Sequence, residues 1–156
     1  MHTQLRLASI FSDHMVLCRN RNIRIFGEAE TGREIVVSIH DHTASCAAVK
    51  SKFEAVLPPM PHGGPYILTV SDGESTLTFA DIFIGDVYFA GGQSNMEWPL
   101  EQSENGPELV KTLGNPMIRY VNFPHNAWLD KNALRHERNM RWKVLEPCRC
   151  AYCAHA

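Results

Sequence analysis

The sequence predicts a β-sandwich-like amino-terminal domain over residues 1–84, followed by the start of an α/β domain over residues 85–147. Short segments rich in Ile, Val, Phe and Thr recur about every ten residues in the first part, with Gly, Pro and Asp turn signals between them. A nearly continuous apolar run and a helical segment then open the second part. Residues 148–156 match neither pattern and form an atypical tail.

Five segments of the first part predict strands, because β-branched and aromatic residues dominate them and partly alternate with polar ones. Strands at this spacing are typical of an all-β sandwich or barrel. No catalytic constellation is visible among them. The segments are IRIFG (23–27), REIVVSIH (33–40), SKFEAVLP (51–58), PYILTVS (65–71) and STLTFADIFIG (75–85).

The second part has a different order of elements. The run DVYFAGG (86–92) is typical of a parallel strand that is covered on both faces. Its successor SENGPELVKTLG (103–114) has the capping and stop residues of a short helix, and NPMIRYVNFP (115–124) predicts a second strand. Strand, helix and strand in this order are the opening of a βαβ unit. A doubly wound sheet needs roughly a hundred or more residues, so we expect this domain to be truncated.

Composition limits the classes of partner. The formal net charge is -2 and charged residues make up 21% of the chain, so there is no electrostatic signature of nucleic-acid or membrane binding. No apolar run approaches the roughly 20 residues of a membrane span, and the opening MHTQLRLASIF does not have the pattern of a signal peptide. The 5 cysteines are odd in number and unevenly placed, which argues against a disulfide framework.

Ser94 is the candidate nucleophile, because it follows the apolar run on a glycine-flanked turn, in GDVYFAGGQSNMEWPL (85–100). A serine hydroxyl needs a base and a stabilised oxyanion to attack an ester. Gly91 and Gly92 permit a sharp turn and close approach of a substrate, and the Ser94 N–H is the first oxyanion donor to consider. The alternative is a glycine-rich turn in which Ser94 only caps the next element, since GGQS is not a GxSxG elbow.

The stretch GDVYFAGGQSNMEWPL resembles the nucleophile block of the sialate O-acetylesterase family, whose hallmark is GQSNMEW. These are carbohydrate esterases of the SGNH (GDSL-like) hydrolase superfamily. The segment LRLASIFSDHMVLCRNRNIRIFGEAETGREIVVSI (5–39) resembles the amino-terminal β-domain of that family. NPMIRYVNFP and RWKVLEP are similar to later family phrases, so the resemblance covers most of residues 5–147. It implies a flavodoxin-like α/β fold for the second part.

The resemblance implies a serine esterase that removes O-acetyl groups from sialic acid or a related acetylated sugar through an acyl-enzyme. Ser94 would be the nucleophile. Gly92, Gln93 and Asn95 would form the substrate-binding or oxyanion loop, although a structural role for Gln93 and Asn95 is equally open. No metal or organic cofactor would be needed. Members of the family are often exported or lysosomal.

The histidine and aspartate of a triad are not recognisable by their pattern. Relatives carry them in a DxxH-type segment, whereas the aspartate and histidines that follow Ser94 do not have this spacing. We therefore expect the chain to be an incomplete fragment of the esterase. His125 or His136 as the base is an alternative, since triad residues need only meet in space. The aspartate that follows Ser94 is Asp130, and the histidines are His125, His136 and His155.

Two further functions stay open. The first is a catalytically inactive product in which the β-domain serves as a carbohydrate-binding or interaction module. The second is an SGNH acetylesterase that acts on acetylated xylan or another polysaccharide. Upstream, we interpret the pairs Asp13-His14 and Asp41-His42 as surface or turn residues.

The tail CRCAYCAHA offers four potential metal ligands, namely Cys148, Cys150, Cys153 and His155. Their spacing, C-x-C-x-x-C-x-H, is a poor match to structural zinc sites. Resemblance to the family also stops at Pro147, where the tail begins. A frameshift or misplaced stop explains both facts more economically than a metal site, so we expect no metal.

Overall fold

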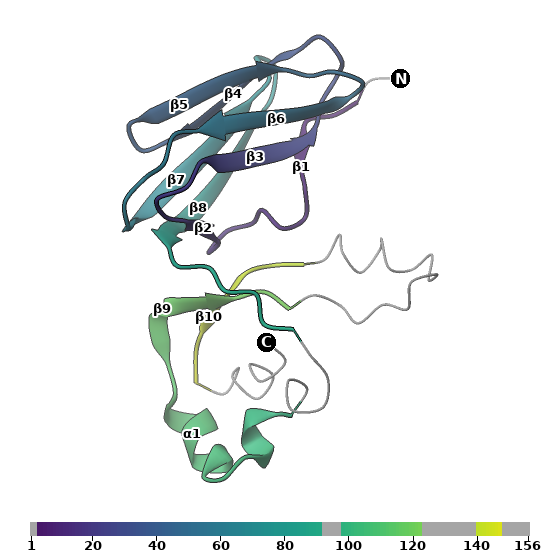
Figure 1. Ribbon diagram of the computed structural model, residues 1–156. Coiled ribbons are helices and arrows are strands. Elements are labelled where there is room, and N and C mark those ends of the chain that lie inside the picture. Colours follow the sequence, from purple (N-terminus) through teal and green to yellow (C-terminus); the bar gives the residue numbers. More distant parts are fainter. Residues whose placement is uncertain (1–2, 92–97, 123–139, 148–156) are drawn as a thin grey trace. The chain divides into compact units, whose positions relative to one another are not determined.

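The computed structural model describes residues 3–91, 98–122 and 140–147 (Figure 1). The chain divides into two compact units, residues 1–87 and residues 88–156. Within the described ranges, no helix combines the length and the apolar character that crossing a membrane requires.

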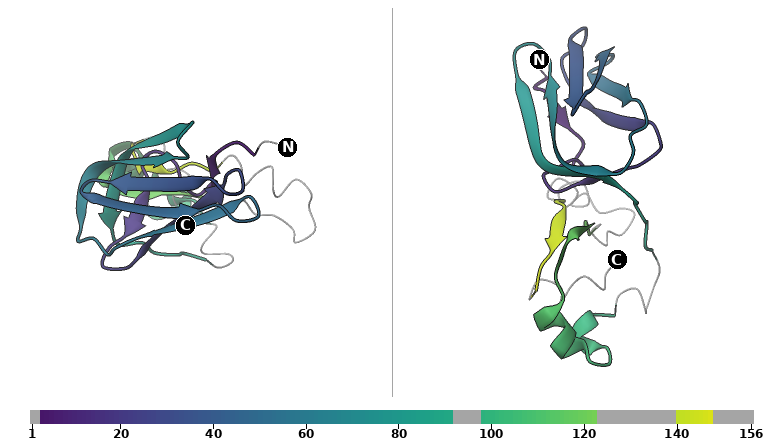
Figure 2. Two further views of the ribbon diagram at one scale, coloured as in Figure 1. Left: turned by 90° about the horizontal axis from the view of Figure 1, so that it is seen from above. Right: turned by 90° about the vertical axis from the view of Figure 1, so that its left-hand side faces the viewer.

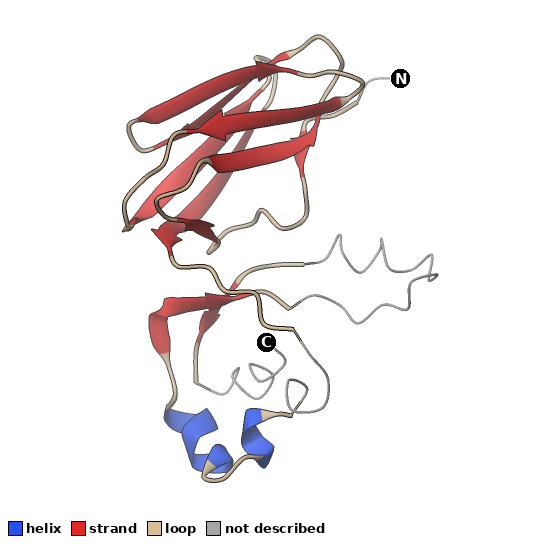
Figure 3. Cartoon of the chain, viewed as in Figure 1, coloured by secondary structure: helices blue, strands red, loops and turns tan. Residues whose placement is uncertain are grey.

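The first unit contains two β-sheets (Figures 1 and 3). One sheet has three strands in the order β1-β3-β6, and the other has five in the order β2-β8-β7-β4-β5. Neighbouring strands are antiparallel, except that β2 runs parallel to β8. The strands are β1 Arg6–Leu7, β2 Val16–Cys18, β3 Ile23–Glu28, β4 Glu34–Ile39, β5 His42–Ala47, β6 Lys52–Leu57, β7 Gly63–Ser71 and β8 Thr76–Gly85.

Apolar side chains from both sheets form the core of this unit. Along β4, Ile35, Val37 and Ile39 are buried, whereas Val36 between them is 38% exposed. Strand β6 alternates in the same way, and both β4 and β5 contact it across the two sheets (Figure 2). This period of two residues is the one that the sequence predicts for strands with one buried face. The prediction of a β-rich first part is confirmed.

Strands β1, β2 and β5 are not among the predicted ones. Strand β5 has the sequence HTASCA, whose small and polar residues give no hydrophobic pattern. Its position is instead set by pairing with β4, from Glu34 opposite Ala47 to Ile39 opposite His42. The tight turn between the two strands uses His40 at a φ of 50°, a left-handed conformation that suits a hairpin.

A bulge in β8 explains the role of Asp13 and His14. The register of β7 with β8 shifts near Asp81, which has a φ of 58°. The His14 Nδ1 atom lies 2.6 Å from Asp81 Oδ2, and the Ala80 N–H donates to Asp13 Oδ1 at 2.8 Å. Asp13 and His14 therefore fix the bulge from a turn that lies 67 residues away in the sequence.

The helical elements described in the second unit are a 3₁₀ helix, η2 (Leu100–Gln102), and the short helix α1 (Gly106–Thr112). Helix α1 lies where the sequence predicts a helix. Strand β9 (Asn115–Tyr120) lies in the segment predicted as the second strand. It pairs antiparallel with β10 (Lys143–Leu145), so that Lys143 lies opposite Tyr120.

Of the predicted βαβ opening, the helix and the second strand are present, whereas the first strand is not formed over the described residues. Residues 86–91 form no strand, and Tyr88 and Phe89 are 86% and 87% exposed. An apolar run becomes a buried parallel strand only where a neighbouring strand pairs with it and helices cover it. No described strand pairs with residues 86–91, and the partner of β9 is antiparallel.

The alternation along β4 gives a matched test of the core. Replacing Val37, which is fully buried, with Thr places a hydroxyl among apolar side chains. We expect this change to lower the free energy of unfolding by about 1 to 3 kcal/mol. The same substitution at half-exposed Val36 should change it by less than about 0.5 kcal/mol. Urea unfolding followed by far-UV circular dichroism measures both, and equal effects would contradict the assigned faces.

Candidate functional site

The residues that the sequence predicts for the site lie outside the described part of the chain. These residues are Gly92, Gln93, Ser94 and Asn95. The histidines of the second unit, His125, His136 and His155, also lie outside it, as do Asp130 and the tail cysteines. The site is therefore described by the two segments that flank residues 92–97.

The upstream flank is the end of β8, which two contacts with Arg19 hold in place. The Arg19 N–H donates to the Gly85 carbonyl at 2.9 Å, and its Nε donates to Asp86 Oδ1 at 2.7 Å. Strand β2 pairs in parallel with β8 up to Gly85, directly before these contacts. The chain thus has a defined exit from the first unit, after which residues 86–91 continue without strand pairing.

The last described residue before the motif is Gly91, and the Phe89 ring packs against it. A Cβ atom at position 91 would lie 2.9 Å from Phe89 Cε1, which is closer than real Cβ atoms come. A larger residue here would have to displace the ring. Because the Phe89 side chain is 87% exposed and can turn away, this contact places little constraint on position 91.

The downstream flank is a compact pair of helical turns. The Gln102 N–H donates to the Pro99 carbonyl at 2.9 Å, and the Ser103 N–H donates to the Leu100 carbonyl at 3.0 Å. Helix α1 follows directly, with Asn105 as its N-cap residue at a φ of 58°. Left-handed backbone at a non-glycine residue is uncommon, and Asn tolerates it better than most. The 3₁₀ helix η2 and helix α1 therefore follow each other directly in the segment downstream of the motif.

Gly106 makes this turn possible, because it is the first residue of α1 and is buried against η2. A Cβ atom at this position would lie 1.9 Å from the Leu100 carbonyl oxygen. That oxygen accepts the hydrogen bond from Ser103, so it cannot move without opening η2. The sequence pattern identifies the helix but gives no sign of this close approach.

The described residues contain one notable histidine-carboxylate contact, between His14 and Asp81, and we assign it to the β8 bulge. A second contact, His40 Nε2 to Asp41 Oδ2 at 3.0 Å, lies in an exposed turn. Among the residues described, no group of three or more His, Cys, Asp or Glu side chains is placed to hold a metal ion.

Comparisons with known proteins give two informative matches. The chain is 28% identical over 127 residues to a mouse (Mus musculus) protein named sialate O-acetylesterase, a match that covers 73% of this chain and 24% of the mouse protein. It is also similar to the crystal structure of a carbohydrate acetylesterase from Xanthomonas citri, with a TM-score of 0.85 and 30% identity. That match covers 94% of this chain and 34% of the bacterial one. No family model matches the chain.

The fold and these matches together define the class: the chain is a relative of carbohydrate acetylesterases. The particular family that the GQSNMEW motif indicates, that of the sialate O-acetylesterases, is confirmed as the one it resembles. The chain spans 24% of the length of the mouse relative and 34% of the bacterial one. The resemblance therefore applies to a part of each relative.

Replacing Gly106 with Ala tests the close approach of α1 to η2. Alanine favours helix more than glycine does, so propensity alone predicts a gain in stability. We expect instead a loss of about 1 to 3 kcal/mol, because the added methyl group must displace the Leu100 carbonyl. All 3 tryptophans, Trp98, Trp128 and Trp142, belong to the second unit, so fluorescence during urea unfolding reports on it.

The control for this substitution is Lys111→Ala, which lies on the same helix. Lys111 makes an exposed ion pair with Glu108 at 3.3 Å, and such pairs contribute little. Its unfolding midpoint should stay close to that of the unmodified protein. A Gly106→Ala midpoint at or above the Lys111→Ala midpoint would contradict the packing described for η2.

Proposed function

We propose that this chain carries the nucleophile of a serine carbohydrate esterase, and that Ser94 attacks sugar O-acetyl esters. The observation that carries the proposal is the GGQSNMEW motif in a chain similar to two acetylesterases. The finer assignments that accompany it are an SGNH-type, flavodoxin-like second domain over residues 85–147 and a β-domain over residues 1–84.

In the proposed reaction, the Ser94 hydroxyl adds to the acetyl carbonyl carbon and gives its proton to a general base. The oxyanion that forms accepts hydrogen bonds from backbone N–H groups of the loop that holds Gly92, Gln93, Ser94 and Asn95. Collapse breaks the bond to the sugar oxygen, which leaves as a hydroxyl group after receiving a proton. Water then attacks the acetyl-serine, releases acetate and restores the Ser94 hydroxyl. This route uses no metal or organic cofactor.

The substrate that we propose is sialic acid or a related sugar with an O-acetyl group. Both relatives support this class, since the mouse protein is named a sialate O-acetylesterase and the bacterial protein is a carbohydrate acetylesterase. An acetylated polysaccharide such as xylan is the competing substrate. Comparing acetate release from O-acetylated sialic acid with release from acetylated xylan separates the two substrates.

The proposal is tested with Ser94→Ala in the complete natural polypeptide that carries this sequence. Hydrolysis of p-nitrophenyl acetate and of O-acetylated sialic acid should fall by about a thousandfold or more, as removal of a serine nucleophile does elsewhere. Ser103→Ala, a change at the next serine along the chain, should leave both rates nearly unchanged.

Equal rates for the unmodified protein and Ser94→Ala would contradict the proposal. They would favour the second functional class, in which the β-domain binds carbohydrate or another partner without turnover. Binding of a glycan by a protein that releases no acetate would point to the same class.

A further inference from the structure

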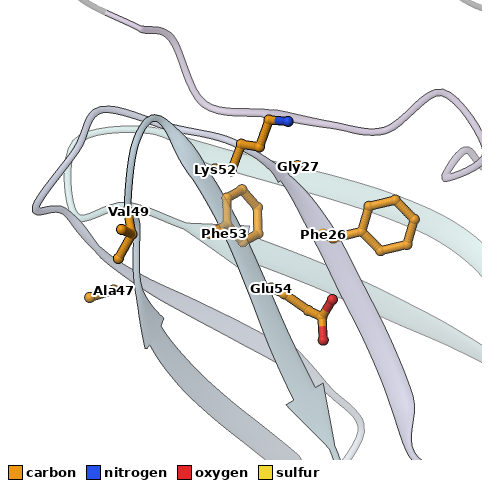
Figure 4. A pocket seen from close by; sticks show the side chains of 7 residues that line it. All are labelled: Phe26, Gly27, Ala47, Val49, Lys52, Phe53 and Glu54. Carbon is orange, nitrogen blue, oxygen red and sulfur yellow. The ribbon is translucent and has the colours of Figure 1, made fainter.

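The three-stranded sheet of the first unit carries a shallow pocket that the proposed esterase chemistry does not use (Figure 4). It is largely open to solvent, so a ligand bound there stays partly exposed. Strands β3 and β6, the end of β5 and Val49 in the connection between β5 and β6 supply its lining. The side chains that matter for its chemistry are Phe26, Ala47, Val49, Lys52, Phe53 and Glu54.

The apolar side of the pocket is a fixed surface that faces solvent. Phe26 is 41% exposed, and Phe11 packs edge-to-face against it with ring centroids 5.1 Å apart. Val49, in the connection between β5 and β6, is 63% exposed, whereas Phe53 in β6 is buried. Because Phe11 already holds the Phe26 ring, Phe26 loses little additional side-chain entropy when a ligand stacks on it.

Glu54 lies directly opposite Phe26 in the register of β3 with β6. Arg24 donates to both of its carboxylate oxygens, at 2.9 and 2.7 Å, and these hydrogen bonds lower the pKa of Glu54. An ionised carboxylate offers about four acceptor positions, so Glu54 keeps capacity for hydroxyl donors after it has paired with Arg24. It is therefore suited to accept hydrogen bonds from a polyhydroxylated ligand.

Lys52 provides a surplus positive charge at the pocket. It lies opposite Glu28 in the register, but Glu28 is already bound by the Arg6 guanidinium, with the closer nitrogen at 2.6 Å. Within the described ranges, the Lys52 side chain makes no hydrogen bond or ion pair. Glu28 and Glu54 are thus each paired with an arginine. The ammonium group of Lys52 is left to attract an anion.

We infer that this pocket binds a sugar that carries a carboxylate. The Lys52 ammonium pairs with the carboxylate, Glu54 accepts hydrogen bonds from the hydroxyl groups, and Phe26 receives the apolar face of the sugar. A fatty acid offers no hydroxyl groups to Glu54, and a neutral sugar offers no charge to Lys52. This site does not involve Ser94, so it can bind an acidic sugar whether or not the chain is an esterase.

The test uses two probes that differ only in charge, N-acetylneuraminate and its carboxamide. Neither carries an O-acetyl ester, so hydrolysis does not complicate the measurement. Titration of the full chain by calorimetry should show N-acetylneuraminate binding about two- to fivefold more tightly, because an ion pair with an exposed lysine contributes modestly. The preference should shrink as salt is added. Equal affinity for the two probes, or no binding of either, would overturn the inference.

Three substitutions test whether the sugar binds in this pocket. Lys52→Gln should remove the preference for the carboxylate, whereas Lys50→Gln, a nearby exposed lysine outside the pocket lining, should preserve it. Phe26→Leu keeps an apolar side chain against Phe11 but removes the aromatic face, and it should weaken both probes severalfold. Circular dichroism checks that each variant is folded. An equal loss in Lys50→Gln and Lys52→Gln would show that general charge attraction, rather than the pocket, binds the sugar.

One further pair of measurements separates this inference from the proposed function. Lys52→Gln should retain p-nitrophenyl acetate hydrolysis, and Ser94→Ala should retain N-acetylneuraminate binding. If Ser94→Ala abolished that binding, the sugar would occupy the proposed esterase loop and the pocket inference would fail.

Discussion

Strand β8 is the element on which the described structure depends. It pairs antiparallel with β7 along one side and parallel with β2 along the other, so it joins the two ends of the first unit's sequence. Its residues Ile82 and Ile84 are buried, while Asp81 forms the bulge that His14 holds. Arg19 then fixes the point at which β8 ends. The chain enters the motif segment from this fixed exit.

The alternation of apolar and polar residues was sufficient to predict β3, β4, β6, β7 and β8. It failed for β5, because HTASCA has no apolar period and its position depends on pairing with β4. For residues 86–91 the error was the reverse: the apolar run predicted a buried strand that is not formed there. Side chains such as Tyr88 and Phe89 are instead exposed. Pairing with the hairpin neighbour β4 decides the structure of β5, and no described strand pairs with residues 86–91. A single sequence displays neither fact.

The candidate site also has features that the sequence predicts and features that it does not. The motif around Ser94 is identified by resemblance, because its length and its Trp and Met residues are specific, whereas the glycine spacing alone fits an ordinary turn. The constraint at Gly106 depends on a carbonyl oxygen of η2 and has no signature in the sequence. The pocket on β3 and β6 is equally hidden, since Phe26 and Glu54 become neighbours only through strand register.

Acylation of Ser94 is tested most directly by mass spectrometry of the natural protein, quenched in acid during turnover of an acetyl ester. We expect the peptide that contains Ser94 to gain the mass of one acetyl group, and fragmentation to place this group on the Ser94 side chain. Acetate release without an acetylated Ser94, or with the acetyl group on another residue, would show that Ser94 is not the nucleophile.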